Sequence, residues 1–345
     1  MAYSTIDDPS LHFNTLLYTG NGGTQSITGV GFTQDFTWIK SRSTSQNHYV
    51  FDTVRGAQKQ LYPSITNAED TGQSNGLNAF TSDGFNLGTE VGVNGNGATF
   101  ASWNWKGGGS ASNNTDGNKT ISLSVNTTAG FSVGTYTGDG QDNTIGHGLG
   151  AIPDWLMIKN RSSGSRKWQL WHNNLTGTNK YLAIDRNAAE ITDSASWDNT
   201  AHSSTVWNTY GSGEANQNGE NFVCYAWTSI KGYSKFGSYK GNGNADGSFV
   251  YLGFKPAWFM VKRIDAADSW GMFDNKRDPR NQVGTRFWAD EADGESTGQA
   301  MDFLSNGFKL RAANAYWNAS GGTYVYFAFA ESPLVNSEGI PNNAR

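Results

Sequence analysis

The sequence predicts an all-β protein made of three tandem antiparallel β-sandwich domains with extended terminal arms. Three observations support this prediction: one long pattern occurs three times, short aromatic stretches alternate with turn signals, and helical periodicity is nearly absent. Many short strands, with turns about every 8–12 residues, are typical of antiparallel sandwiches of the jelly-roll type.

Each copy of the repeat runs from a tyrosine, in a Tyr-x-Gly-Asn/Asp-Gly stretch, to a lysine that ends an aromatic strand. The tyrosines are Tyr18, Tyr136 and Tyr239, and the lysines are Lys40, Lys159 and Lys262. Each copy also closes on a similar aromatic stretch, at Phe100–Trp105, Phe222–Trp227 and Tyr324–Phe329. A repeat of this length is a whole small domain rather than one turn of a solenoid. We therefore expect shared residues to serve the common fold and any special function to lie where the copies differ.

The domain organisation follows from the repeat and from local composition. The predicted segments are an N-terminal arm (1–11), repeat 1 (12–107), a flexible Gly/Ser/Asn-rich linker (108–119), repeat 2 (120–230), repeat 3 (231–331) and an extended C-terminal tail (332–345).

Within each repeat, the local pattern indicates strands and hairpins. Phe36–Lys40 and Trp168–His172 are short, aromatic and partly alternating, and Asn-Gly pairs mark turns. Phe80–Leu87 and Phe303–Leu310 are the same element in repeats 1 and 3. The matching part of repeat 2, near Val206–Tyr210, has diverged.

Composition excludes several classes of function. The 345 residues include 43 glycines, 13% aromatic residues and only 16% charged residues, which argues for a folded chain with ample apolar surface. The net charge of −5, without any basic run, argues against nucleic-acid binding, and no apolar stretch is long enough to insert into a membrane. The single cysteine, Cys224, lies in an aromatic strand and is expected to be a buried small hydrophobe. The chain is expected to be made in a reducing cytoplasm.

Catalytic and metal-binding patterns are not evident. The five histidines lack the spacing of a zinc site, and neither a nucleophile elbow nor a phosphate-binding loop occurs, so we expect no metal and no cofactor. A carboxylate recurs at one place in the three repeats, which raises the hypothesis of a glycoside hydrolase. Because the same acid occurs in triplicate, a turn or capping role is the favoured interpretation of Glu69, Glu190 and Glu295.

The recurring lysines have recurring acidic residues about a dozen positions further on, at Asp52 and Asp274, with His172 at the same place in repeat 2. The favoured interpretation is a cross-strand ion pair between each lysine and the acid on the partner strand. For His172 we expect a structural hydrogen bond rather than catalysis.

Three tryptophans lie outside the shared strands, at Trp197, Trp288 and Trp317. Alignment of the repeats places Trp317 with Asn94 and Asn216, and Trp288 with Pro63 and Ala183. An exposed ring in a loop is a candidate for stacking on a sugar, whereas a ring at a contact between units or subunits is the favoured alternative.

The chain resembles a family of uncharacterised structural proteins of marine tailed bacteriophages. The resemblance covers nearly the whole chain and is carried by Tyr18–Gly22, His147–Pro153, Gly232–Tyr239, Phe273–Arg277, Leu304–Leu310 and Ala328–Pro333. It implies a virion component, often a tail fibre, with a lectin-like (concanavalin-like) β fold, and it brings no catalytic residues.

The expected function is therefore that of a non-enzymatic virion protein of the tail or a fibre, with host-surface glycan attachment as a further expectation. Expected partners are other virion proteins and further copies of the chain. A capsid decoration protein without a ligand and a glycan-degrading virion enzyme remain the alternatives.

Overall fold

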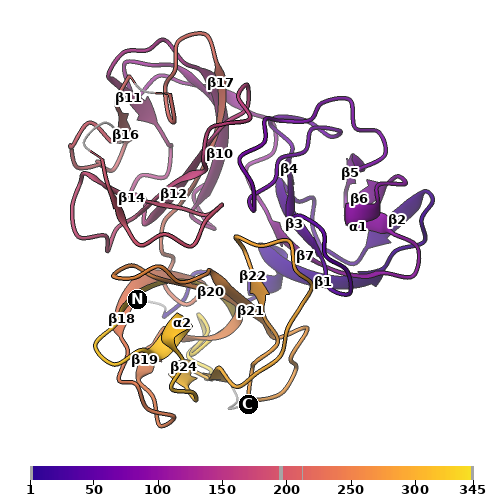
Figure 1. Cartoon of the computed structure of the whole chain (residues 1–345), viewed down its shortest axis with the longest axis vertical. Helices are drawn as coiled ribbons and strands as arrows, with labels where there is room; N and C mark the ends of the chain where they lie inside the picture. The colour runs from indigo at the N-terminus through magenta and orange to yellow at the C-terminus, as the bar shows by residue number, and fades with distance from the viewer. Residues whose placement is uncertain (1–2, 194–196, 212, 343–345) are drawn as a thin grey trace.

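The computed structural model describes residues 3–193, 197–211 and 213–342 and confirms the all-β prediction. Strands make up 41% of the chain and helices 3%, and the paired strands of its sheets are antiparallel. Figure 1 shows three lobes around a common centre, and they correspond to residues 12–107, 120–230 and 231–331, here called units 1, 2 and 3. The finer assignment to a jelly-roll or concanavalin-like topology stays a prediction.

Each unit has one main sheet, in which the first strand of the repeat pairs with the last, and the last pairs with the third. In unit 1 the order is β1 (Phe13–Thr19), β7 (Thr99–Trp105), β3 (Phe36–Ser41) and β4 (Tyr49–Asp52). In unit 2 it is β10 (Phe131–Thr137), β17 (Asn221–Trp227), β12 (Trp155–Asn160), β13 (Gln169–His172), β14 (Lys180–Ala183) and β15 (Ile191–Thr192). In unit 3 it is β18 (Ser234–Lys240), β25 (Thr323–Pro333), β20 (Phe254–Arg263), β21 (Gly271–Asp274) and β22 (Phe287–Trp288).

A small sheet completes each unit as a sandwich. Unit 1 has β2 (Gln25–Thr28), β6 (Gly84–Leu87) and β5 (Leu77–Thr81), and unit 3 has β19 (Phe249–Tyr251), β24 (Gly307–Leu310) and β23 (Met301–Leu304). In the part of unit 2 that the structure describes, this sheet has only β11 (Asn143–Gly146) and β16 (Val206–Thr209). The short segments η1 (Pro9–Leu11), α1 (Val91–Asn94) and α2 (Ala315–Asn318) are the helical elements of the described chain.

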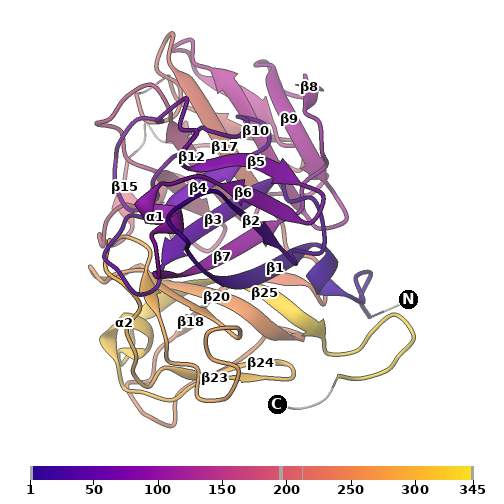
Figure 2. The same cartoon turned by 90° about the vertical axis from the view of Figure 1, so that its right-hand side faces the viewer.

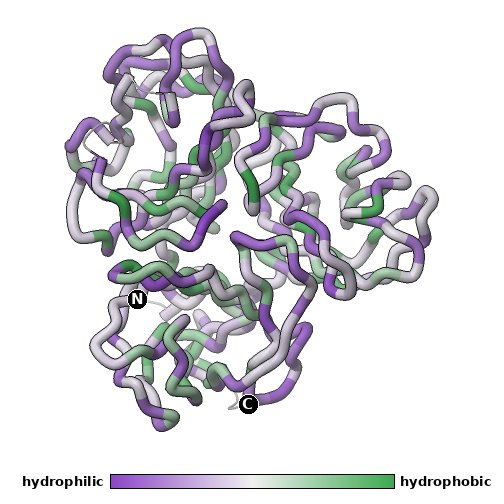
Figure 3. The backbone as a smooth tube through the Cα atoms, viewed as in Figure 1, coloured by the Kyte–Doolittle hydropathy of each residue, from purple (hydrophilic) through white to green (hydrophobic). Residues whose placement is uncertain are grey.

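The main sheets are buried on both faces. Successive side chains of a strand point to opposite sides, and each side of these sheets is covered by other residues of the protein. In β3, Ile39 packs against the small sheet of its own unit, whereas Phe36 and Trp38 point to the centre of the molecule. Figure 3 shows the hydrophobic stretches mainly in the strands of the three lobes and the hydrophilic stretches mainly in the loops. This explains why β3 and β12 are buried at every position instead of at every second one.

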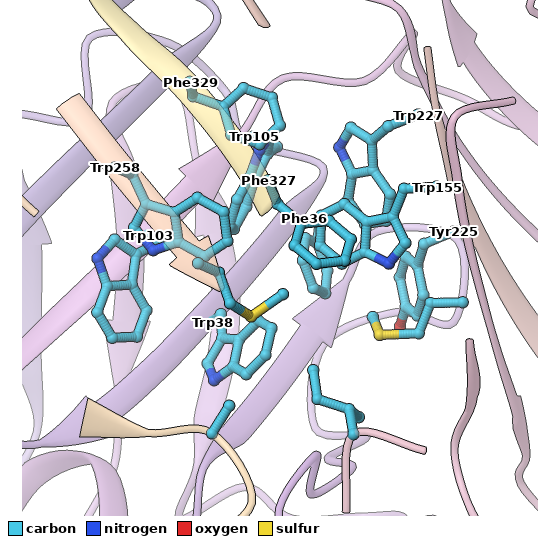
Figure 4. Packing of buried hydrophobic residues seen from close by; sticks show 14 of the residues in the cluster. Phe36, Trp38, Trp103, Trp105, Trp155, Tyr225, Trp227, Trp258, Phe327 and Phe329 are labelled. Atoms are coloured by element: carbon cyan, nitrogen blue, oxygen red, sulfur yellow. The ribbon is translucent and has the colours of Figure 1, made fainter. Parts of the chain in front are cut away.

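All three units contribute to one central core, which contains eight of the thirteen tryptophans. Contacts across it include the ring of Phe36 at 4.6 Å from Tyr225 and the ring of Trp155 at 4.7 Å from Phe327 (Figure 4). Aromatic pairs at such distances contribute about 0.5–1.5 kcal/mol each beyond the area that they bury. The units therefore are not packed as separate tandem domains, and the boundaries of independently folding segments stay a prediction.

The segment 108–119, predicted as a flexible linker, is partly a strand. Within it β8 (Ser112–Asn114) pairs with β9 (Ile121–Asn126), which extends the main sheet of unit 2 beside β10. The prediction of a flexible linker is therefore wrong for this stretch.

Hydrogen bonds connect the described parts of both termini to the rest of the chain, and the C-terminal tail projects from the end of β25 as a loop (Figure 2). Ile6 is buried in the central core, and the Tyr3 hydroxyl shares a hydrogen bond with that of Tyr251 at 2.7 Å. Asp7 accepts a hydrogen bond from the backbone N–H of Ser337 in the C-terminal tail at 2.7 Å. The segment before unit 1 is thereby anchored to unit 3 and to the C-terminal tail.

Candidate functional site

The recurring tyrosines occupy equivalent surroundings. The hydroxyls of Tyr18, Tyr136 and Tyr239 donate to the carbonyls of Val93, Ala215 and Trp317, at 2.8 Å for the first and 2.7 Å for the third. Their rings stack on Phe100, Phe222 and Tyr324, each with centroids 5.1 Å apart. These tyrosines fasten the first strand of each unit to the loop before its last strand, which is a structural role.

A recurring asparagine follows each of these carbonyls and corrects the alignment of Trp317. Asn94, Asn216 and Asn318 each accept a hydrogen bond from the backbone of the Asn/Asp-Gly turn that opens their unit. Trp317 is therefore equivalent to Val93 and Ala215, and the prediction that placed it with Asn94 and Asn216 is wrong by one residue.

The recurring lysines are fully buried, and each connects two units. Lys40 donates to the carbonyl of Ala292 in unit 3 at 3.0 Å, Lys159 to that of Thr66 in unit 1 at 2.9 Å, and Lys262 to that of Asn187 in unit 2 at 3.1 Å. Burial lowers the pKa of Lys40 to about 7 and the pKa values of Lys159 and Lys262 to about 8. These bonds run from unit 1 to 3, from 3 to 2 and from 2 to 1, so the three units form a closed head-to-tail ring. We call the three unit boundaries seam 1–2, seam 2–3 and seam 3–1.

The predicted cross-strand ion pairs between these lysines and Asp52 or Asp274 are wrong. Asp52 lies opposite Phe36 and Asp274 opposite Trp258, in each case four residues before the lysine. At about 3.3 Å per residue, this register separates lysine and acid by roughly 13 Å along the strands.

A ring N–H crosses each seam beside the lysine. Trp168 donates to the carbonyl of Tyr62 at 2.8 Å and Trp270 to that of Ala183 at 3.2 Å. His48 accepts from the indole of Trp38 through Nδ1, so its Nε2 carries the proton and donates to the carbonyl of Trp288 at 3.0 Å. Trp288 is therefore equivalent to Tyr62 and Ala183, and its predicted alignment with Pro63 is wrong by one residue.

Seam 1–2 and seam 3–1 contain buried charge. Asp52 binds Arg55 at 2.5 Å and accepts from the hydroxyl of Tyr225, in unit 2, at 2.7 Å. Asp274 binds Arg277 at 2.6 Å and accepts from the indole of Trp103, in unit 1, at 3.2 Å. All four charged side chains are fully buried. Sequence reasoning missed the two arginines, although the spacing Asp-x-x-Arg recurs in both units.

Seam 2–3 has neutral residues at the equivalent positions. His172 replaces the aspartate, Leu175 the arginine and Phe327 the donor from the next unit. The Nδ1 of His172 accepts from the N–H of Asn174 at 3.1 Å, so Nε2 donates to the carbonyl of Tyr326, in unit 3, at 3.2 Å. Burial lowers the pKa of His172 to about 3 and keeps the ring neutral. The expected structural hydrogen bond of His172 is therefore present.

The recurring glutamates also lie at the seams. The backbone N–H groups of Glu69, Glu190 and Glu295 donate to carbonyls of the next unit, those of Arg161, Ile264 and Arg42, at 2.8–2.9 Å. The side chain of Glu69 binds Arg161 at 2.7 Å, and that of Glu295 binds Arg42 at 2.8 Å. Glu190 faces Ile264 and instead accepts from Thr176 of its own unit. These bonds support a structural role for the three glutamates rather than acid–base catalysis.

The candidate tryptophans differ in exposure. Trp197 and Trp317 are 0% and 1% exposed, in the cores of units 2 and 3, so neither ring offers a face to a sugar. Trp288 is half-buried and lies 4.6 Å from the exposed ring of Tyr316, and the guanidinium of Arg286 lies 5.1 Å from its centroid. The carbonyl of Trp288 binds His48 at seam 3–1, whereas its ring packs against Tyr316 and Arg286 of its own unit. Both a contact between units and stacking on a sugar therefore stay predictions for this ring.

Within the described ranges, no group of three or more His, Cys, Asp or Glu residues is arranged to hold a metal ion. The described helices include none with the length and apolar character needed to cross a membrane.

The profile of one protein family, described as a domain of unknown function (DUF7483), matches residues 8–333 of the chain. A comparison with curated proteins found no match.

Proposed function

We propose that this chain, which belongs to the family described as a domain of unknown function (DUF7483), is a structural protein of a tailed-bacteriophage virion. In this proposal it is a non-enzymatic tail or fibre component that presents loops to the host surface. The resemblance of its motifs to virion proteins motivates the proposal.

The observation that carries the proposal is the use of the recurring polar side chains. The recurring lysines and aspartates, together with Glu69 and Glu295, belong to residue types that catalysis often recruits, and they bind across the seams instead. Buried groups held by several hydrogen bonds rigidify a packed structure. A closed ring held in this way supports a role in rigid display, with unit-specific loops left for contacts with a host glycan, with other virion proteins or with further copies of the chain.

The proposal is tested on purified particles of the phage that encodes the chain. Mass spectrometry of gradient-purified particles should detect the chain at a stoichiometric level, and cryo-electron microscopy should trace it in the tail or in a fibre. Density on the capsid surface would instead support a decoration protein. A chain that is abundant in the lysate but missing from particles washed at high salt would contradict a virion role.

A glycan-degrading enzyme is the alternative from another class. The recurring acids offer it little support, because Glu69 and Glu295 are held by arginines in different seams. Release of reducing ends from host polysaccharide by the purified chain would favour that alternative over display.

A further inference from the structure

Unit 2 departs from the shared architecture next to its small sheet. In units 1 and 3 a hairpin supplies the second and third strands of this sheet, β5–β6 and β23–β24. In unit 2 the described residues before β16 form no such strand, and the irregular segment 197–205 occupies this stretch of the chain. It contributes Trp197, Thr200 and His202, and such a difference between copies is where we expect a special function.

A pocket of about 430 Å³ lies beside this segment. This volume falls within the range of about 300–1,000 Å³ that is typical of small-molecule sites. One wall is the ring of Trp171 in β13, which is half-buried. The equivalent rings in the other units, Phe51 and Phe273, are fully buried, so only unit 2 leaves part of this ring accessible.

His202 holds the Trp171 ring in place and adds a polar group. The rings of His202 and Trp171 lie 4.5 Å apart at an angle of 65°, and the ring of Trp197 lies 5.5 Å from that of His202. The Nδ1 of His202 accepts a hydrogen bond from the N–H of Asn208 at 3.3 Å, so Nε2 carries the proton. His202 is only 5% exposed, and its Nε2 has no hydrogen-bond partner among the described residues. A buried donor without an acceptor is costly, and an acceptor brought by a ligand would relieve that cost.

Further polar groups line the pocket without giving it a positive charge. Asp154 accepts from the backbone N–H of Ser229 at 2.6 Å and from the amide of Asn173, which orients that side chain. The hydroxyls of Thr178 and Thr200 donate to Asn199 and Asp198, and their remaining lone pairs can accept. Among the described residues, neither lysine nor arginine lines this pocket, which disfavours an anionic ligand.

From these contacts we propose that the pocket of unit 2, at Trp171 and His202, binds a neutral pyranose residue of a saccharide. The apolar face of a sugar ring packs on an aromatic ring, and its hydroxyls match the amide, hydroxyl, carboxylate and imidazole groups around Trp171. The inferred biological role of the site, attachment to a host glycan, rests on the proposed virion function, whereas saccharide binding itself does not.

The test uses the full chain and the methyl glycosides of glucose, galactose, mannose and N-acetylglucosamine as probes. Saturation-transfer NMR should detect at least one of them, with a dissociation constant on the order of 1 mM for a single sugar ring. Trp171→Ala should weaken this binding at least tenfold, and His202→Phe, which keeps a ring but removes the donor, should weaken it severalfold. Trp288→Ala, which removes a half-buried ring in unit 3, is the matched control and should leave binding unchanged.

Two results would overturn the proposed saccharide site. One is no saturation transfer from any of the four glycosides at about 20 mM, which would mean binding at least tenfold weaker than expected. The other is equal binding by the wild type and Trp171→Ala. Circular dichroism and the indole N–H spectrum show whether each variant is folded. If Trp171→Ala is unfolded, His202→Phe and Thr200→Val decide the question through their own losses of binding. If the chain is found on the particle but binds none of the sugars, only the proposed saccharide site is refuted. If the chain binds sugar but is missing from the particles, only the virion function is refuted.

Discussion

Seams 1–2 and 2–3 join equivalent surfaces with different chemistry. Three hydrogen bonds to backbone carbonyls are equivalent at both seams. Their donors are the buried lysine, the ring N–H of a tryptophan and the backbone N–H of the recurring glutamate. The side chains differ as a set: Asp52, Arg55 and Tyr225 at seam 1–2 become His172, Leu175 and Phe327 at seam 2–3. The buried aspartate and arginine are therefore present only where their whole group of partners is present, as expected if an unpaired buried charge is costly.

The largest effect is expected when a charge is introduced at the position of His172 in seam 2–3. His172→Asp buries a carboxylate beside Leu175 and Phe327, and it should lower the free energy of unfolding by roughly 5 kcal/mol. Adding Leu175→Arg supplies the partner that the other units have and should recover about 2 kcal/mol or more. Denaturant unfolding of wild type, single and double variants measures both values. Equal stability of the single and double variants would show that the set of partners does not act as a unit.

Substitution by asparagine at the three equivalent positions compares the contribution of the buried aspartates with that of the neutral histidine. Asp52→Asn leaves Arg55 without its closest anion and should cost about 3 kcal/mol, whereas His172→Asn removes one neutral hydrogen bond and should cost about 1 kcal/mol. Asp274→Asn is the internal replicate and should resemble Asp52→Asn. The comparison fails if His172→Asn proves as damaging as the two aspartate variants.

Acid should destabilise seam 2–3 through protonation of His172. Burial lowers its pKa to about 3, below the value of about 6.5 in an unfolded chain, so the unfolded state binds the proton first as the pH falls. The contribution of His172 to stability is complete above about pH 6.5 and is lost progressively as the pH falls toward 3, with about 2 kcal/mol lost between pH 7 and pH 5. His172→Asn should be less sensitive to acid by that amount. His12, His48, His147 and His202, whose pKa values burial also lowers, contribute to the residual slope in both proteins. Parallel stability curves for wild type and His172→Asn would contradict this assignment.

The smallest effect is expected at the partly exposed pair of seam 3–1. Arg42→Ala removes a bidentate ion pair with Glu295 and should cost about 1 kcal/mol, and less at high salt. Arg263→Ala serves as the control, because its pairs with Asp265 and Asp268 stay within unit 3. We expect a loss of only about 0.5 kcal/mol there, and the same loss in both variants would show that the seam adds nothing to a surface pair.

The sequence was sufficient for the fold class and for the repeat, because alternation and turn residues are local signals. It also indicated a buried Cys224, which the structure confirms at 3% exposure. The sequence did not indicate that the three units close into a ring, since the partners of Lys40 and Lys159 lie 252 and 93 residues away in other units. The predicted ion pairs failed because a count of residues between lysine and acid ignores the register of the strands.

Candidate sites were harder to predict than the fold, because exposure of an aromatic ring depends on what covers it. Trp197 lies in an irregular segment and Trp317 in the short helix α2, and yet both are buried, whereas Trp171 lies in a shared strand and is partly accessible. This accessible ring lies in the unit whose small sheet has two strands in the described residues, against three in units 1 and 3. The divergence near Val206–Tyr210 was visible in the sequence, although its consequence for Trp171 was not.

Differential scanning calorimetry of the full chain tests most directly whether the three units share one core. The account predicts a single transition, with an unfolding enthalpy of roughly 240 kcal/mol at about 0.7 kcal/mol per residue, and with a ratio of calorimetric to van't Hoff enthalpy near one. Three separable transitions, or a ratio near three, would contradict it by showing that the units unfold independently of the seams.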